Sequence, residues 1–287
     1  MTHRALILGV ALLTVAVLAD PLPALELFDL QRRQTATLQE AVERIQPGHI
    51  LLVGESHTSA DHHTIQLALI RALVEAGRRV IVGMEMFRRD SQALLDAWVA
   101  GGLPEERFAA VYADNWNYPW ELYRPILLYA RDRGLPLLGL NVPRAVTRQV
   151  ARSGFASLSP EQRGHLPATT CEVSDDYRDF IREAHGAHGH GGMPFEHFCE
   201  AQLVWDQSMA ITALEALAAA PAAVVVILAG SGHARKGGIP AQIGVRGTTP
   251  VTVFLPEVPG SLDPESVDAR SADEVYAKYG WKNDPGK

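Results

Sequence analysis

One short stretch of the chain has the residue types and spacing that acid–base or metal chemistry needs. In LLVGESHTSADHH, residues 51–63, a run of strand-forming residues ends at a glycine, and Glu55 and His57 follow it directly. His62 and His63 come shortly afterwards, in the expected first turn of the next helix. A carboxylate and an imidazole at the end of a buried strand can transfer protons or bind a metal ion.

Similar residues follow three further strand-like runs: Glu85, then Asn141 and Arg144, then Ser231, His233 and Arg235. In an open parallel sheet, ligands bind beyond the carboxyl ends of the strands. We therefore expect Glu55, His57, Glu85 and His233 to meet in one cleft. For any one of them the alternative is a helix cap or a loop hydrogen bond. Four at matching strand ends favour a site that binds a divalent metal ion or transfers protons.

The segment at residues 151–200 interrupts the strand–helix rhythm and holds five of the 11 histidines: His165, His185, His188, His190 and His197. Its tract HGAHGHGG can bind a metal or a haem iron, or it is a mobile polar loop. Tyr177 lies just before it in DDYRDF, and a tyrosine phenolate can be an axial haem ligand. Tyr177 can equally be an ordinary half-buried aromatic residue. We expect this segment to be an inserted helical lid.

The remaining elements must hold these residues in place. Apolar runs without alternation predict buried strands near 50–53, 80–86, 135–142, 223–230 and 250–257. Helical spacing predicts helices at about 37–45, 64–77, 90–102, 123–134 and 213–222. This alternation predicts an α/β fold with a largely parallel central sheet flanked by helices, over about residues 35–255. Residues 256–287 read as an irregular C-terminal segment with a short helix near 272–279.

Composition narrows the classes of function. The 287 residues are 47% hydrophobic, with a net charge of -7 and a pI near 5.9. Nucleic-acid binding would need a basic stripe, so we expect no nucleic-acid partner. Two cysteines exclude a scaffold built on disulfides, although Cys171 and Cys199 can pair with each other in an exported protein.

The N-terminus has the pattern of an export signal. Arg4 precedes an uncharged apolar run over residues 5–19, which is short for a bilayer span. We expect residues 1–19 to be a signal peptide and the mature protein to be periplasmic or in the cell envelope, rather than held by a membrane anchor. The first 30 residues contain no cysteine for lipid attachment.

Five segments in order resemble the ChaN-like haem-binding proteins of the Tiki and erythromycin-esterase-like superfamily: LLVGESHTSADHH, GMEMFRRDSQALLDAWVAG, YRPILLYARDRGLPLLGLNVPR, EAQLVWDQSMA and LAGSGHARKGGIPAQI. The resemblance covers about residues 35–255. It implies an α/β fold with a helical insertion. It also implies haem held by a tyrosine, a homodimer with two haems face to face, and an outer-membrane haem-uptake system as partner.

The resemblance also assigns residues. Glu55, His57, Glu85 and His233 match positions that look like the active-site set of hydrolytic relatives. Tyr177 is the candidate iron ligand, with His185 and His188 as further cofactor-binding candidates. The candidates for pairing with the haem propionates are Arg144 and Arg235, together with Arg88 and Arg89. Apolar contact with the haem can come from Met86, Phe87, Trp116, Trp120 and Phe195.

Two functions follow from these residues. The first is an exported haem-binding protein in bacterial iron or haem acquisition, which depends on the lid and on Tyr177. The alternative is a metal-dependent or Glu/His-based hydrolase, which depends on the four strand-end residues.

Overall fold

The computed structural model describes residues 25–187, 192–257 and 267–277. The expected signal peptide and His188 lie outside these ranges. Within them, no helix combines the length and apolar character needed to cross a bilayer.

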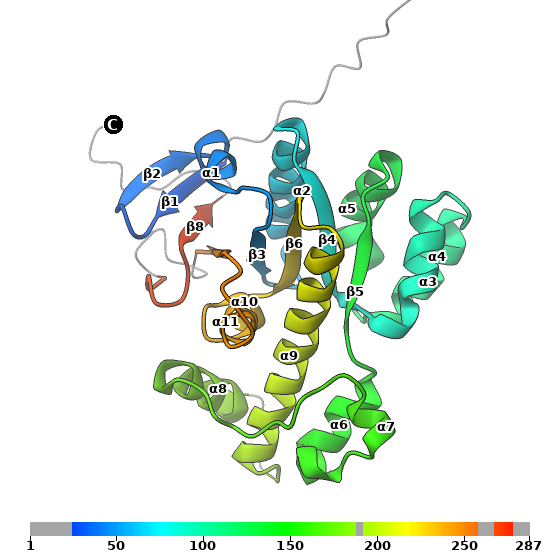
Figure 1. The fold of residues 1–287 in the computed structure, drawn as a ribbon, viewed down its shortest axis with the longest axis vertical. Coiled ribbons are helices and arrows are strands. Elements are labelled where there is room, and N and C mark those ends of the chain that lie inside the picture. The colour runs from blue at the N-terminus through cyan, green and yellow to red at the C-terminus, as the bar shows by residue number, and fades with distance from the viewer. Residues whose placement is uncertain (1–24, 188–191, 258–266, 278–287) are drawn as a thin grey trace, which may run out of the picture.

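In these described residues, eight strands form one sheet in the order β2-β1-β8-β7-β3-β6-β4-β5 (Figure 1). Their bounds are β1 Glu26–Asp29, β2 Gln34–Thr37, β3 Ile50–Glu55, β4 Arg79–Arg88, β5 Leu137–Asn141, β6 Ala223–Gly230, β7 Val251–Pro256 and β8 Glu274–Ala277. The strands from β8 to β5 pair in parallel, and β1 runs antiparallel to β8 and β2. The predicted α/β fold with a largely parallel sheet is therefore confirmed.

Eleven α-helices occur in the described ranges: α1 Leu38–Arg44, α2 Ala60–Glu75, α3 Gln92–Val99, α4 Glu105–Asn115, α5 Trp120–Arg133, α6 Arg144–Ser153, α7 Pro160–Arg163, α8 Asp175–Ala187, α9 Phe195–Ala219, α10 Ser231–Ala234 and α11 Ile239–Gly244. Two short 3-10 turns, η1 Arg89–Ser91 and η2 Phe155–Ser157, join them. A capping box between Thr37 and Glu40 begins α1, and the Ser59 side chain caps α2.

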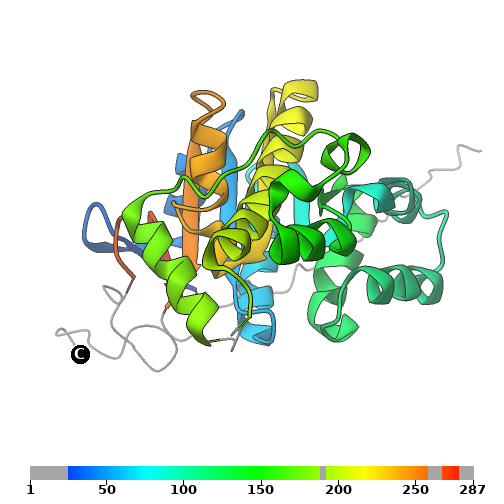
Figure 2. The same ribbon diagram turned by 90° about the horizontal axis from the view of Figure 1, so that it is seen from below.

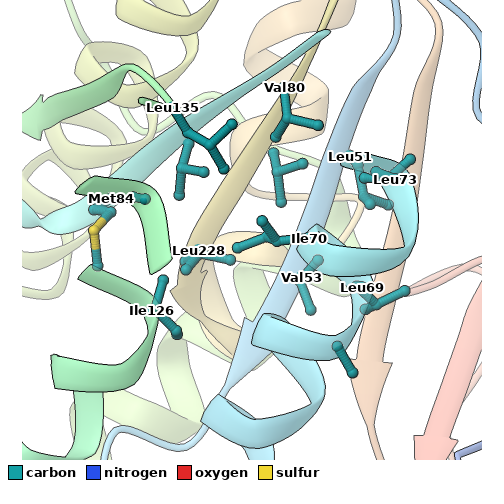
Figure 3. Close-up of a cluster of buried hydrophobic side chains, with 14 of the residues drawn as sticks. Leu51, Val53, Leu69, Ile70, Leu73, Val80, Met84, Ile126, Leu135 and Leu228 are labelled. Carbon is teal, nitrogen blue, oxygen red and sulfur yellow. The ribbon is translucent and has the colours of Figure 1, made fainter. Parts of the chain in front are cut away.

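Both faces of the sheet are covered, as the uninterrupted apolar strands predict. Because successive side chains of a strand point to opposite faces, Leu51 and Val53 of β3 pack with α1, α2 and α5 on one side. Figure 3 shows this cluster. Ile50 and Leu52 pack with α9 and α11 on the other side. Figure 2 shows α9 and α11 on one face of the sheet and α2 on the other.

The expected lid is helical and lies beyond the carboxyl ends of the strands, where α6, α7, α8 and the first half of α9 gather (Figure 1). A disulfide between Cys171 and Cys199 joins the segment before α8 to α9, which confirms the expected pairing. Tyr177 and Ile181 of α8 pack with this disulfide and Leu203 in a small cluster. The lid helix is therefore fixed to α9 by a covalent bond and by its own small core.

The C-terminal segment differs from the prediction in one respect. The helix expected near 272–279 is wrong, because residues 274–277 form β8 between β7 and β1. Val275 and Tyr276 are fully buried there. Pairing with two distant strands satisfies the backbone hydrogen bonds of this short segment, and this outweighs its weak local preference for a helix.

Candidate functional site

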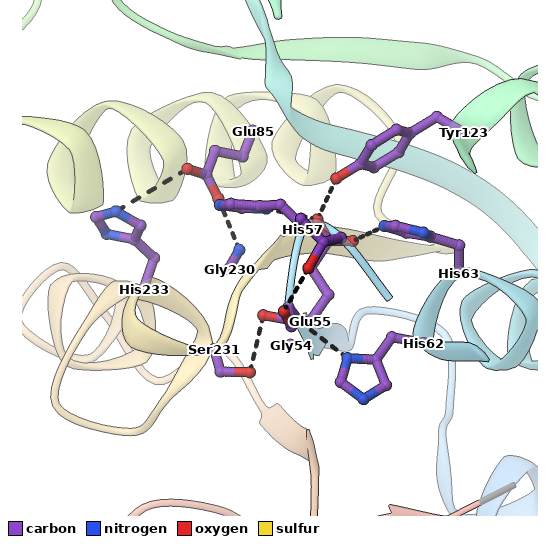
Figure 4. Close-up of polar contacts among 12 residues, drawn as sticks. Gly54, Glu55, His57, His62, His63, Glu85, Tyr123, Gly230, Ser231 and His233 are labelled. Carbon is purple, nitrogen blue, oxygen red and sulfur yellow. Dashed lines mark hydrogen bonds and ion pairs between the residues drawn. The ribbon is translucent and has the colours of Figure 1, made fainter. Parts of the chain in front are cut away.

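Glu55 ends β3 and is the centre of the first half of the site (Figure 4). Its side chain is fully buried and accepts hydrogen bonds from Nδ1 of His57 at 2.7 Å and Nε2 of Gln66 at 2.8 Å. The Tyr123 hydroxyl also donates to it. Nε2 of His63 lies 3.1 Å from its other oxygen. Four side chains, from α2, α5 and the turn after β3, therefore surround one carboxylate.

This surrounding explains how a buried carboxylate stays charged. Burial alone would raise the pKa of Glu55, but hydrogen bonds and positive charge from His57 and His63 outweigh it and lower the pKa to about 2. Burial and the charge of Glu55 together raise the pKa of Tyr123, so its phenol remains a proton donor. Glu55 is thus an acceptor fixed in place, and it orients His57.

His57 presents its second nitrogen to the rest of the site. Nδ1 is held by Glu55, so Nε2 lies on the free side of the ring, next to Gly230. A Cβ atom at position 230 would lie 3.0 Å from Cε1 and 3.1 Å from Nε2 of His57. A side chain at position 230 would therefore require the imidazole to shift by a few tenths of an ångström. Burial lowers the pKa of His57, but the Glu55 hydrogen bond and the Glu85 charge outweigh this and raise it.

Glu85 lies between the two halves of the site (Figure 4). One of its carboxylate oxygens accepts a hydrogen bond from the backbone N–H of Gly230 at 2.7 Å. The other lies 4.0 Å from Nε2 of His233. The side chain of Asn141 fixes the same stretch of β4 by donating to the Glu85 backbone carbonyl at 3.0 Å.

His233 forms the second half of the site with a residue that the motif analysis did not single out. Its Nδ1 donates to Asp206 of α9 at 2.7 Å, and the Tyr177 hydroxyl donates to the other oxygen of Asp206 at 2.7 Å. Burial alone would lower the pKa of His233, but the charges of Asp206 and Glu85 raise it to about 9. The two carboxylates therefore favour the imidazolium form of His233 over the neutral ring.

The site consequently has two similar arms that meet at Glu85. Each arm is a tyrosine, a buried carboxylate and a histidine, namely Tyr123–Glu55–His57 and Tyr177–Asp206–His233. The structure brings the four predicted strand-end residues together at the carboxyl edge of the sheet. Such carboxylate–imidazole pairs fix the tautomer and leave Nε2 available for a ligand or a proton.

Sequence reasoning missed Asp206, Tyr123, Gln66 and His63. Asp206 had one detectable signal, since it is the only charged residue in the stretch LVWDQSMA of a helix that is buried on most sides. His63 lies in the first turn of the helix after Glu55, as expected, but its contact with Glu55 was not predicted: its side chain is buried and faces that carboxylate. Tyr123 and Gln66 lie on ordinary amphipathic helices, where nothing local separates them from core or surface residues.

Two of the predicted haem-binding residues, Tyr177 and His185, lie in different surroundings in the structure. Tyr177 is buried, and burial together with the charge of Asp206 raises its pKa well above the usual value, so its phenol is neutral here. His185 packs against Phe195 and Phe198, and its Nε2 lies 3.0 Å from the Met193 carbonyl oxygen. Tyr177 thus contacts the site through Asp206, whereas the contacts of His185 are with Met193, Phe195 and Phe198.

Two of the four arginines predicted to pair with propionates, Arg144 and Arg235, border the site. Arg144 begins α6 and donates to the side chain of Asn117 at 3.1 Å and to the Asn115 carbonyl at 2.9 Å. Arg235 follows α10, donates to the Ser271 hydroxyl at 3.1 Å and stacks on the ring of Phe180 at 4.0 Å. Of the other two arginines, Arg88 pairs with Asp90 and Asp114, and Arg89 pairs with Glu215.

A pocket of about 410 Å³ lies beside Glu55 and Ser231. Phe180, Leu255 and Val267 supply apolar walls, and Arg235 supplies a positive charge. This volume lies within the range of ordinary small-molecule pockets. Among the residues that line it is His62, whose Nδ1 accepts a hydrogen bond from the Ser56 backbone N–H at 2.9 Å.

Aromatic rings also flank the two histidines. The rings of Trp116 and Tyr118 each lie 5.0 Å from that of His57, and the ring of Trp205 lies 5.6 Å from that of His233. Across the part of the chain that the structure describes, no three His, Cys, Asp or Glu side chains are arranged to hold a metal ion. The divalent metal ion of the alternative function stays a prediction.

Comparison with solved structures gives the same fold. ChaN of Campylobacter jejuni, a structure described as showing cofacial haem binding, superposes with a TM-score of 0.69 at 18% identity, covering 89% of this chain and 97% of that one. The type III effector HopBA1 superposes with a TM-score of 0.50 at 14% identity, covering 83% and 90%. At these identities the likeness establishes the fold alone.

The chloroplastic Protein RETICULATA-RELATED 5 of Arabidopsis thaliana is 24% identical over 224 residues, which is 70% of this chain and 30% of that protein. The chain thus spans less than a third of this relative. The model of the family described as haem-binding uptake, Tiki superfamily, ChaN matches residues 41–243, a range that contains both arms of the site and the lid. The resemblance seen in the motifs is confirmed, and the chain belongs to the ChaN family of the Tiki superfamily.

Proposed function

We propose that this protein is an exported haem-binding protein that takes part in haem or iron acquisition. The observation that carries the proposal is the match of the haem-binding ChaN family model over residues 41–243. That range includes Tyr177, His185, Arg144 and Arg235, the candidate haem-binding residues of the described structure.

The residues beside the site fit a haem. The pocket next to Glu55 has apolar walls from Phe180, Leu255 and Val267, as contact with a porphyrin ring requires. Arg235 lies in the same wall and can pair with a propionate through two parallel hydrogen bonds. Tyr177 supplies an oxygen that suits ferric iron once it is ionised, as haem-ligating tyrosines do.

Binding through Tyr177 has a defined cost. Its hydroxyl donates to Asp206, and the buried carboxylate raises its pKa. Iron binding by the phenolate therefore requires this hydrogen bond to break and the phenol to lose its proton. Bound haem would supply the absorbing, redox-active iron centre that an acquisition protein carries.

The test is an absorption titration of the purified protein with haemin. We expect a saturable Soret change at one haem per chain, and we expect Tyr177→Phe to weaken binding and remove any tyrosinate charge-transfer band. Tyr129→Phe is the matched control, because the Tyr129 hydroxyl has no hydrogen-bond partner among the described residues and α5 holds it outside the site. His185→Ala should have a smaller effect than Tyr177→Phe.

Three outcomes separate the possibilities. If Tyr177→Phe binds haemin like the wild type, Tyr177 is not the ligand, and His185 or His188 becomes the candidate. If the wild type does not bind haemin specifically, the haem proposal is wrong. Intact-mass analysis of the periplasmic fraction tests export, with cleavage near Ala19 expected. Light scattering with and without haemin tests the proposed homodimer, and association with an outer-membrane uptake system stays a proposal.

A second candidate function is a Glu/His-based hydrolase, favoured by the two carboxylate-held histidines that meet at Glu85. In this reaction the oxygen of a water molecule attacks the ester carbonyl. The water gives its proton to the Glu85 carboxylate, and the leaving alcohol takes a proton from the imidazolium of His233. Such acid–base groups each contribute typically 10²–10⁴-fold to the rate.

Chromogenic aryl esters, assayed with and without added divalent metal, test this candidate. Glu85→Gln and His233→Gln should each lower kcat/KM by at least about 10²-fold. Asp179→Asn, an exposed carboxylate on the lid helix, is the matched control and should leave the rate unchanged. No ester hydrolysis above background by the wild type, under either condition, would end this reading.

A further inference from the structure

We propose that Asp206 is a positioning residue of the site, holding His233 protonated with Nε2 directed at Glu85, and that Tyr177 completes the arrangement by hydrogen bonding to Asp206. The inference deepens the second candidate function and rests on it for its catalytic meaning. The geometry itself can be tested without any substrate or haem.

Three observations carry the proposal. Asp206 is completely buried in α9, where an unpaired carboxylate would be strongly unfavourable. Its two oxygens have different partners, Nδ1 of His233 and the hydroxyl of Tyr177, both at 2.7 Å. These partners come from α10 and α8, so the carboxylate joins three separate segments of the chain.

The arrangement repeats the first arm of the site. There Glu55 accepts from Nδ1 of His57 and from a tyrosine hydroxyl, and it too is fully buried. Two unrelated parts of the sequence thus build the same tyrosine–carboxylate–histidine order on opposite sides of Glu85. A carboxylate retained only for helix packing would have no reason to reproduce this order.

The consequence for His233 follows from the groups that face it. Asp206 lies on one side of the ring and Glu85 lies 4.0 Å from Nε2, while Trp205 packs edge-on against it. Both carboxylates favour the imidazolium over the neutral ring, and burial opposes them. Asp206 therefore fixes which nitrogen faces Glu85 and keeps a proton on it.

The experiment is a histidine titration by long-range ¹H–¹⁵N NMR on the full chain, with no ligand added. In the wild type, His233 should remain protonated through neutral pH and titrate near pH 9. In Asp206→Asn the pKa should fall below the wild-type value, because the larger of the two carboxylate charges is lost while Glu85 and burial remain. An asparagine amide can also donate to Nδ1, which would reverse the tautomer of the neutral ring.

Controls separate positioning from folding. Asp179→Asn on the lid helix should leave the His233 titration unchanged, since Asp179 pairs with Arg182 at the surface. Tyr177→Phe removes a hydrogen bond to Asp206 but keeps the charge, so His233 should retain a raised pKa. If Asp206→Asn does not fold, the wild-type titration alone decides.

A wild-type His233 that titrates near 6.5 overturns the proposal, and so does an Asp206→Asn variant in which His233 still titrates near 9. Either result leaves the haemin and ester assays untouched. Conversely, a failure of those assays leaves the titration result standing, so the two failures are distinguishable.

Discussion

The disulfide allows the most direct calculation from the structure. Cys171 and Cys199 are 28 residues apart in sequence, and both are buried. In the chain-entropy model, closing a loop of this length removes about 12 cal/mol/K from the unfolded chain, or about 3.5 kcal/mol at 25 °C. We expect reduction to lower the free energy of unfolding by about that amount.

The assay compares urea unfolding of the same protein with and without a reductant. Thermal unfolding gives a second measurement. Because the unfolding entropy is about 2.1 cal/mol/K per residue, a loss of about 3.5 kcal/mol in the free energy of unfolding corresponds to a fall in Tm of about 6 °C or more. A Cys171→Ala/Cys199→Ala double variant should unfold still earlier, because the cluster around Ile181 and Leu203 also loses contacts.

Hydrogen exchange locates the effect. Reduction should speed exchange in α8 far more than in α2, since the bond fixes the lid segment to α9 and α2 lies in the main core. Two results would refute the reasoning. One is a count of two free thiols in unfolded, unreduced protein, and the other is an unchanged unfolding free energy on reduction.

Three further predictions concern the two arms. The pKa of His233 is raised from 6.5 to about 9, so its stabilisation is complete below pH 6.5 and is lost as the pH rises through about 9. Urea unfolding at pH 6, 8 and 10 should show this decline, and Asp206→Asn should reduce it, because only the Glu85 charge then favours the imidazolium. The pKa of Glu55 is lowered from 4.5 to about 2, so its stabilisation is present above pH 4.5 and is lost as the pH falls through about 2. In Glu55→Gln the free energy of unfolding should therefore fall less steeply as the pH is lowered below 4.5. An unchanged fall would contradict the lowered pKa of Glu55. Gly230→Ala places a methyl group 3.0 Å from the His57 ring and should lower the free energy of unfolding by about 1–3 kcal/mol, measured by urea unfolding. It should also move the His57 resonances in the NMR spectrum. A variant with wild-type stability and spectrum would show that the ring has room to shift.

The central strands could be predicted because each is buried on both faces. Residues 50–53 and 223–230 are apolar without alternation, which is the pattern of a parallel sheet covered by helices on both sides. The strand at 274–277 has no such run. Its stability comes from pairing with residues 254–256 and 26–29, and partners at that distance leave no mark on the local sequence.

The part of the site that the order of strands and helices determines could be predicted from the sequence. Glu55 ends β3, Glu85 lies in the last half of β4 and His233 follows β6, and these strands pair in parallel, so the meeting of the three residues follows from the order of strands and helices. Asp206 reaches the same place from the middle of a 25-residue helix. Its position depends on how α9 crosses the sheet, which helix periodicity does not specify.

The oxygen of Tyr177 can donate a hydrogen bond to Asp206 or, once ionised, bind haem iron, but it cannot do both at once. If it ligates haem iron as proposed, each binding event must first release it from Asp206. A hydrogen bond to a charged group is worth about 1.5–3 kcal/mol, which would weaken the apparent affinity roughly ten- to a hundredfold compared with a free phenol. The same exchange favours release, because Asp206 is ready to take the hydroxyl back when the haem leaves. For a protein that must pass haem to another protein, competition from Asp206 makes haem release more favourable, although it lowers the affinity for haem.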